Sequence, residues 1–149
     1  MILRNKSQYP DSTVRALVKF ATRELDMRHV CVNVRNSTGS LAGHAYRGVP
    51  SISNAPPSAE YLVTLRIGDR SRFPVEHRYP GKSGNRWPFI YLEDWREAVV
   101  YLAAHEGKHI DQFRAGTKRS EIACEHFARY MLNAYRDTLY IASAARPKA

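Results

Sequence analysis

The pattern of apolar positions predicts a helix followed by a series of strands in the first two thirds of the chain. Asp11–Met27 has helical spacing, because Val14, Leu17, Val18, Ala21 and Leu25 recur on one face after Pro10. Alternating or β-branched segments predict strands at Val30–Arg35, Gly43–Gly48, Tyr61–Ile67 and Trp87–Leu92. The polar stretch Gly68–Asn85 is rich in proline and glycine and is expected to form a long loop, such as a rim or a flap over a site.

The last third of the chain has the spacing of two helices. The first is expected from Glu93 to about Arg114, where Asp94 and Glu97 resemble a capping box and Gly116 follows the helix. The second is expected from about Arg119 to Ala142, with Ala123, Phe127, Met131 and Tyr135 at core spacing. The order of elements therefore predicts an α+β fold: an N-terminal helix, a small mixed or antiparallel sheet, and two further helices.

The length of the chain, 149 residues, is that of one ordinary domain, and we expect a single domain over residues 1–149. The N-terminus has no apolar core of a secretory signal, and apolar runs such as Ala98–Ala104 are too short to span a bilayer. Cys31 and Cys124 are too few for a disulfide framework and are expected to be buried thiols. These features favour a cytoplasmic protein that has no membrane partner.

The chain is basic, with 23 Lys and Arg residues against 14 Asp and Glu residues and a formal net charge of +9. Such a surface favours an anionic partner, such as nucleic acid or an acidic protein. The basic residues are spread along the chain and form no recognisable nucleic-acid module, so a merely solvated surface is the alternative interpretation.

One motif carries chemistry, the sequence His105-Glu106-Gly107-Lys108-His109 inside the first of the two C-terminal helices. Residues four apart on a helix lie only about 40° apart around its axis, so His105 and His109 can hold one metal ion together. Glu106 lies about 60° from His109 on the same arc, where it can act as a general base without being a ligand. The motif therefore predicts a zinc site.

A catalytic zinc ion has three protein ligands and an open position, so a third ligand must come from elsewhere. Glu121 and Glu125 are the candidates, since they lie one turn apart on the following helix, on the face that carries Cys124. We expect Glu121 to be the ligand and Glu125 to support a ligating histidine. The alternatives are Glu125 as the ligand with Glu121 at the rim, or a ligand from His126.

The motif followed by a helix that contains Glu121 resembles the gluzincin metallopeptidases. The order and size of the elements resemble the smallest, zincin-like members: minigluzincin, SprT-like and ImmA/IrrE-type domains. Residues 121–132, with Glu121, then Phe127-Ala128 and an aliphatic pair, are similar to the ImmA/IrrE-type signature. The resemblance covers mainly residues 94–135. Asn133 stands where a proline is expected, and no four-cysteine zinc ribbon follows, so the subfamily and its substrate are open.

The resemblance implies a zinc metallopeptidase in which Glu106 is the general base and a protein or peptide is the substrate. In such domains an edge strand above the cleft pairs with the extended substrate, and Tyr61–Ile67 would be that strand here. A second donor to the oxyanion is also needed, and the candidates are Tyr130, His44, His77 and Tyr46.

Two other functions fit the sequence. The first is a basic binding module for nucleic acid or protein, whose zinc site is vestigial or structural. The second is a peptidase that its charge recruits to nucleic acid and that cleaves proteins bound there.

Overall fold

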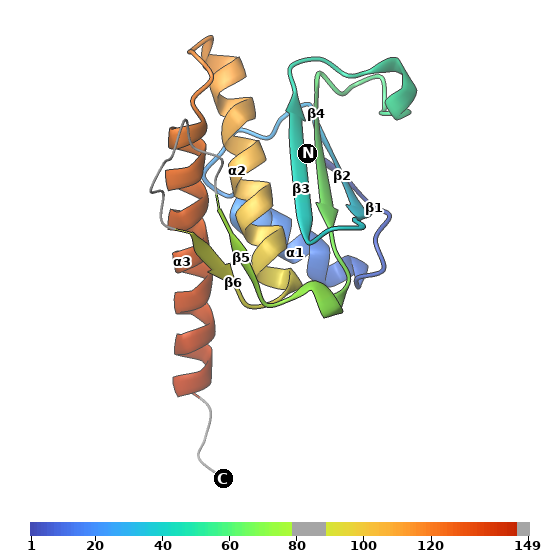
Figure 1. Ribbon diagram of the computed structural model, residues 1–149. Helices are drawn as coiled ribbons and strands as arrows, with labels where there is room; N and C mark the ends of the chain where they lie inside the picture. Colours follow the sequence, from blue (N-terminus) through green and yellow to red (C-terminus); the bar gives the residue numbers. More distant parts are fainter. Residues whose placement is uncertain (79–88, 146–149) are drawn as a thin grey trace.

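The computed structural model describes residues 1–78 and 89–145, which form an α+β fold (Figure 1). Its elements are β1 (Ile2–Asn5), α1 (Asp11–Ala21), β2 (Val30–Asn36), β3 (Leu41–Tyr46), η1 (Ser51–Ser53), β4 (Tyr61–Ile67), η2 (Arg70–Arg72), β5 (Val75–His77), β6 (Ile90–Leu92), α2 (Trp95–Ala115) and α3 (Glu121–Ala144). The predicted mixed sheet is present, and β5 and β6 add a small antiparallel sheet beside it.

The main sheet has four strands in the order β1-β2-β4-β3. β1 and β4 both run parallel to β2, whereas β3 runs antiparallel to β4 and forms the edge. The expectation that Tyr61–Ile67 is an edge strand is therefore wrong. That strand buries Leu62, Val63, Leu65 and Ile67 and needs a neighbour on each side, whereas β3 buries only Ala45 and otherwise has half-buried and exposed residues, which suits an edge.

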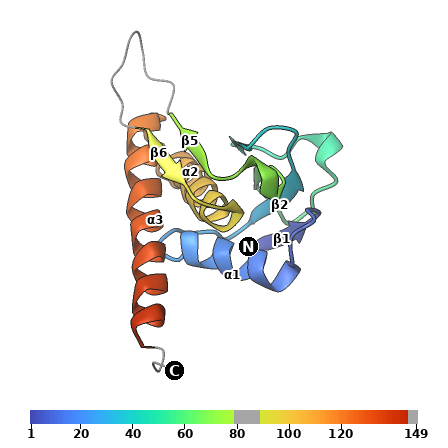
Figure 2. The ribbon, with the colours of Figure 1, turned by 60° about the horizontal axis from the view of Figure 1, so that its bottom comes forward.

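The helices form two layers on one face of this sheet. α1 and α2 pack against the strands, and α3 packs on α2 on the side away from the sheet (Figures 1 and 2). Because α2 lies between the sheet and α3, it is buried on nearly all sides, including His105, Glu106 and His109. The fold thus places a polar motif inside its most enclosed helix.

The ends of α2 follow the predicted signals, with one difference at the N-terminus. The Asp94 side chain accepts a hydrogen bond from the backbone N–H of Glu97 at 3.0 Å, and Gly116 ends the helix in the left-handed region at φ 65°. Glu97, however, accepts from the backbone N–H of Glu93 rather than from the cap residue. Its carboxylate also accepts two hydrogen bonds from the guanidinium of Arg136, from Nη2 at 2.7 Å and from Nε at 2.9 Å. This ion pair connects α3 to the start of α2.

Several boundaries differ from the sequence prediction. α1 ends at Ala21 rather than Met27, because the chain turns at Thr22 and enters β2 through His29, whose φ is 61°. β1 and β5 were not predicted, and β5 lies in the stretch 68–85 that was expected to be a loop. Residues 79–85 of that stretch, and residues 87–88 of the strand predicted at Trp87–Leu92, lie outside the described residues.

The two cysteines are buried free thiols, as predicted. Within the described ranges, no helix is long and apolar enough to cross a membrane.

Candidate metal centre

The centre lies where the middle of α2 meets the start of α3. Small residues around the motif let other elements approach α2 closely: a side chain on Gly107 would lie 2.8 Å from Leu25 Cδ1, in the segment after α1. Ser120 caps α3 by accepting a hydrogen bond from the backbone N–H of Ala123 at 3.2 Å, so that Glu121 is the first residue of the helix. Because the connection between α2 and α3 is short, Glu121 lies next to the two histidines of α2.

The carboxylate of Glu121 joins the two histidines. Its Oε2 atom lies 3.1 Å from Nε2 of His105, and its Oε1 atom lies 3.1 Å from Nε2 of His109. Ligands held about 2.0–2.1 Å from a tetrahedral zinc ion lie about 3.3 Å from one another, so the observed separations are close to those of a ligand set. Arg119 also contacts Oε1, at 3.1 Å.

The outer nitrogen of His109 faces acceptors on the opposite side of its ring. Nδ1 lies 3.2 Å from Oε1 of Gln112 and 3.3 Å from Sγ of Cys124. Gln112 is itself fixed, since the backbone N–H of Ser120 donates to the same Oε1 at 3.2 Å. A proton on Nδ1 leaves the lone pair of Nε2 directed at Glu121, which is the tautomer that a metal ligand requires.

The outer nitrogen of His105 faces Glu125. Nδ1 of His105 lies 3.6 Å from Oε2 of Glu125, and this oxygen accepts a hydrogen bond from the hydroxyl of Tyr101. Nε of Arg129 donates to the other carboxylate oxygen at 3.0 Å. Burial acts to raise the pKa of Glu125, but these hydrogen bonds and the arginine outweigh it and lower the pKa to about 2. Glu125 is therefore an ionised, fully buried carboxylate behind His105.

A buried group of three residues could hold a metal ion. His105, His109 and Cys124 each offer a donor atom, and these atoms lie within 4.8 Å of one another. Burial raises the pKa of the Cys124 thiol to about 12. His126, in contrast, is exposed on α3. The centre thus combines the two histidines of the motif with either a carboxylate or a thiol from α3.

Glu106 lies beside this centre on the sheet side of α2. Its side chain is buried, and among the described residues its Oε2 atom has no hydrogen-bond partner. Burial raises the pKa of Glu106 to about 7, although the charge on His105 opposes the shift. A buried carboxylate with a free oxygen and a pKa near neutrality has the properties of a general base.

A cavity of about 160 Å³ opens next to Glu106, between α2, the edge strand β3 and β5. It is lined by Leu41, Ala42, Gly43, His77, Tyr101, Leu102, His105 and Glu106. Gly43 lets the strand approach, because a side chain there would lie 2.9 Å from both Cγ and Oε1 of Glu106. The cavity therefore places the backbone of an edge strand beside the candidate base.

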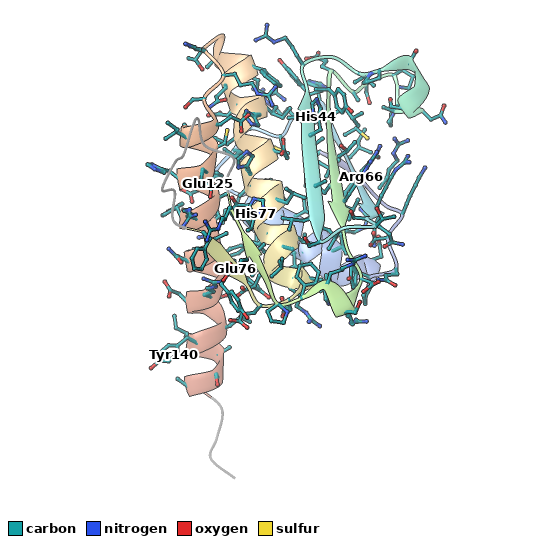
Figure 3. All side chains as sticks on the ribbon, in the orientation of Figure 1. His44, Arg66, Glu76, His77, Glu125 and Tyr140 are labelled. Atoms are coloured by element: carbon teal, nitrogen blue, oxygen red, sulfur yellow. The ribbon has the colours of Figure 1, made fainter. Side chains whose placement is uncertain are left out.

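Of the four side chains predicted as oxyanion donors, His77 is the one that lines this cavity, and it reaches the cavity from β5 (Figure 3). Its ring meets that of Tyr101 at 5.2 Å between centroids. His44 and Tyr46 lie on the opposite face of β3, and Tyr130 is an exposed residue on the far side of α3 from Glu121.

Four residues that contact the candidate ligands or Glu106 were missed by the sequence analysis. Three of them lie three or four residues from a candidate ligand on the same helix, and that spacing could have revealed them. Tyr101 precedes His105 by four residues, Gln112 follows His109 by three, and Arg129 follows Glu125 by four. The fourth, Gly43, could not be found, because its role depends on which strand forms the edge.

Comparison of the chain with protein-family models, with curated proteins and with solved structures found no match.

Proposed function

We propose that the protein is a zinc-dependent metallopeptidase, with His105, His109 and Glu121 as the metal ligands and Glu106 as the general base. The observation that carries the proposal is the carboxylate of Glu121, which lies 3.1 Å from Nε2 of each histidine. Beside it, Glu106 is buried with a free carboxylate oxygen. Two imidazoles and one carboxylate form a ligand set of catalytic zinc sites, which leave a fourth position open.

The directions of the histidine rings favour Glu121 over Cys124 as the third ligand. Both Nε2 atoms point to Glu121, whereas the thiol lies 3.3 Å from Nδ1 of His109, on the other side of that ring. One imidazole offers a single lone pair when its other nitrogen carries a proton. Oε1 of Gln112 can accept the proton on Nδ1 of His109 in a hydrogen bond, so the lone pair is on Nε2, which faces Glu121.

The chain's own residues divide the remaining work of hydrolysis. When bound, zinc supplies the Lewis acidity that polarises a peptide carbonyl and acidifies water. Glu106 takes a proton from the attacking water and passes it to the leaving amine, for which its raised pKa is suited. Glu125 would hold the ring of His105 in place, and His77, which lines the cavity, would donate a hydrogen bond to the developing oxyanion.

The edge of the sheet supports a proposal for the substrate class. β3 pairs with β4 on one side, and no other described strand pairs with its free edge, which borders the cavity. An extended peptide can add to such an edge through backbone hydrogen bonds, which recognise no particular side chain. We therefore propose unfolded or extended protein segments as substrates, bound along β3 rather than along Tyr61–Ile67.

Purified protein tests this function through its metal content and its activity on an unfolded protein such as casein. We expect about one zinc ion per chain by elemental mass spectrometry, and cleavage that a chelator stops and added zinc restores. His105→Ala should lose both properties. Protein that neither retains nor takes up zinc would refute the proposal, and zinc-loaded protein without cleavage would make the site structural.

Substitution of Gly43 tests the role of the edge strand. In Gly43→Ala, the new Cβ would meet Glu106 at 2.9 Å and displace its carboxylate, so cleavage should fall about 10-fold to 100-fold while the zinc content is kept. Gly48→Ala is the matched control, because nothing lies within 4 Å of the added atom there. Equal rates in the two variants would show that the close approach of β3 does not position Glu106.

A further inference from the structure

The main sheet has a second face, which points away from the three helices and takes no part in the metal centre. The register pairs Arg35 of β2 with Arg66 of β4, and Arg66 in turn with Ala42 of β3. One step along the same rows, Thr64 of β4 is paired with His44. Because residues two apart share a face, these side chains form one continuous surface, and Figure 3 shows Arg66 on the side of β4 away from α2.

Part of this face is covered and part is open. Arg4 of β1 extends across Asn33 and donates to the backbone oxygens of Ser53 and Asn54, at 3.0 and 2.6 Å. The segment around η1 is thereby held over the β1–β2 side of the sheet. The remaining part, which is exposed or half-buried among the described residues, consists of Arg35, Ala42, His44, Tyr46, Thr64 and Arg66, and we call it the outer face.

The outer face carries two positive charges that form no ion pair within the described part of the chain. Arg35 and Arg66 are exposed, and no acidic side chain among the described residues forms an ion pair with either. Arg72 lies beside Gly68, near the end of the same strand. Asp69 is the acidic neighbour there; its carboxylate accepts a hydrogen bond from the backbone N–H of Ser71 at 2.8 Å and also attracts Arg72.

Two rings lie next to these arginines. The rings of His44 and Tyr46 are 4.2 Å apart between centroids, and both belong to the outer face of the edge strand. With Thr64 and Arg66 they line a shallow hollow of about 170 Å³ that opens to solvent. The outer face thus combines two cations with an exposed ring, His44, and a half-buried ring, Tyr46, on one surface of a sheet.

We propose that the outer face binds single-stranded nucleic acid. Unpaired cations complement a phosphate backbone, and the rings offer stacking surfaces for bases that are not held in a duplex. An acidic peptide would use the arginines but would gain little from the rings. The outer face and the cavity beside Glu106 lie on opposite faces of β3, so nucleic acid could bind whether or not the metal centre is active.

Fluorescence anisotropy with a labelled oligothymidylate of about 20 nucleotides tests the proposal on the full chain. In the double variant Arg35→Gln/Arg66→Gln, loss of two phosphate contacts should weaken binding about 50-fold at about 50 mM salt. It should also reduce the slope of log K against log salt by about 1.4. Tyr46→Ala should weaken binding about tenfold with an unchanged slope, since stacking releases no counterions.

The matched control is Lys19→Gln/Arg23→Gln, which removes the same charge from exposed positions on α1 and just after it, on the helical side of the sheet. It should change the affinity by less than about threefold. Equal losses in the two double variants would overturn the proposal, because they would show attraction to the net charge alone. Equally tight binding of a duplex would overturn it too, as would binding of polyglutamate without oligothymidylate. Circular dichroism verifies that each variant is folded.

Discussion

Glu106→Gln should lower the rate of peptide cleavage by about 10²–10⁴-fold and leave the zinc content unchanged. Glutamine has the shape of glutamate but cannot accept the proton of the attacking water. Glu106 points to the cavity beside β3, whereas the two Nε2 atoms of the histidines face Glu121, so its replacement removes no proposed ligand. Initial rates on an unfolded protein substrate and elemental analysis of the same sample measure both quantities.

Glu76→Gln is the control for this variant, because it makes the same chemical change at an exposed position on β5 (Figure 3). It should retain the wild-type rate. A Glu106→Gln variant that keeps its activity would exclude Glu106 as the base. A variant that loses zinc would instead place Glu106 among the ligands, and the mechanism would have to change.

Glu121→Gln should weaken zinc binding by more than about 100-fold, whereas Cys124→Ser should weaken it by less than about tenfold. The first change replaces a carboxylate that lies against both histidines by a neutral amide, which is a poor metal ligand. The second removes only one of two contacts with the outer nitrogen of His109, and Oε1 of Gln112, 3.2 Å from the same nitrogen, still holds the ring in place. Competition with a chromophoric chelator gives both affinities.

The cobalt-substituted protein provides an independent test of the third ligand. A cysteine thiolate bound to Co²⁺ gives an intense charge-transfer absorption that carboxylate and imidazole ligands do not give. We expect wild type and Cys124→Ser to have the same spectrum. A thiolate band in the wild type that disappears in Cys124→Ser would assign the third position to the thiol, within the group of His105, His109 and Cys124.

The sequence predicted the long elements of the fold well and the short ones poorly. The three helices and the strands β2 and β4 have enough apolar residues in register for their period to be recognised. β1 has four residues and β5 has three, which is too short for a period. The order of the strands in the sheet could not be predicted from the sequence either. β4 pairs in parallel with β2 and separates it from β3, although β3 follows β2 directly in the chain, and that choice depends on tertiary packing.

For the candidate site, local spacing carried most of the information. His105, Glu106 and His109 lie on one helix, and Glu121 and Glu125 lie one turn apart on the next, so their relative directions follow from helix geometry. The cavity could not be anticipated in the same way, because it needs Gly43 and His77 from strands far away in the sequence. The position of Cys124 behind His109 depends on how α2 and α3 pack.

The short link between α2 and α3 has a consequence for the order of folding. Helix pairs that are adjacent in sequence close small loops and assemble quickly, whereas the parallel pairing of β2 with β4 must wait for distant segments to meet. His105, His109 and Glu121 all belong to the fast-forming part. We therefore expect zinc to bind an early helical hairpin and to accelerate refolding, and not only to stabilise the finished protein.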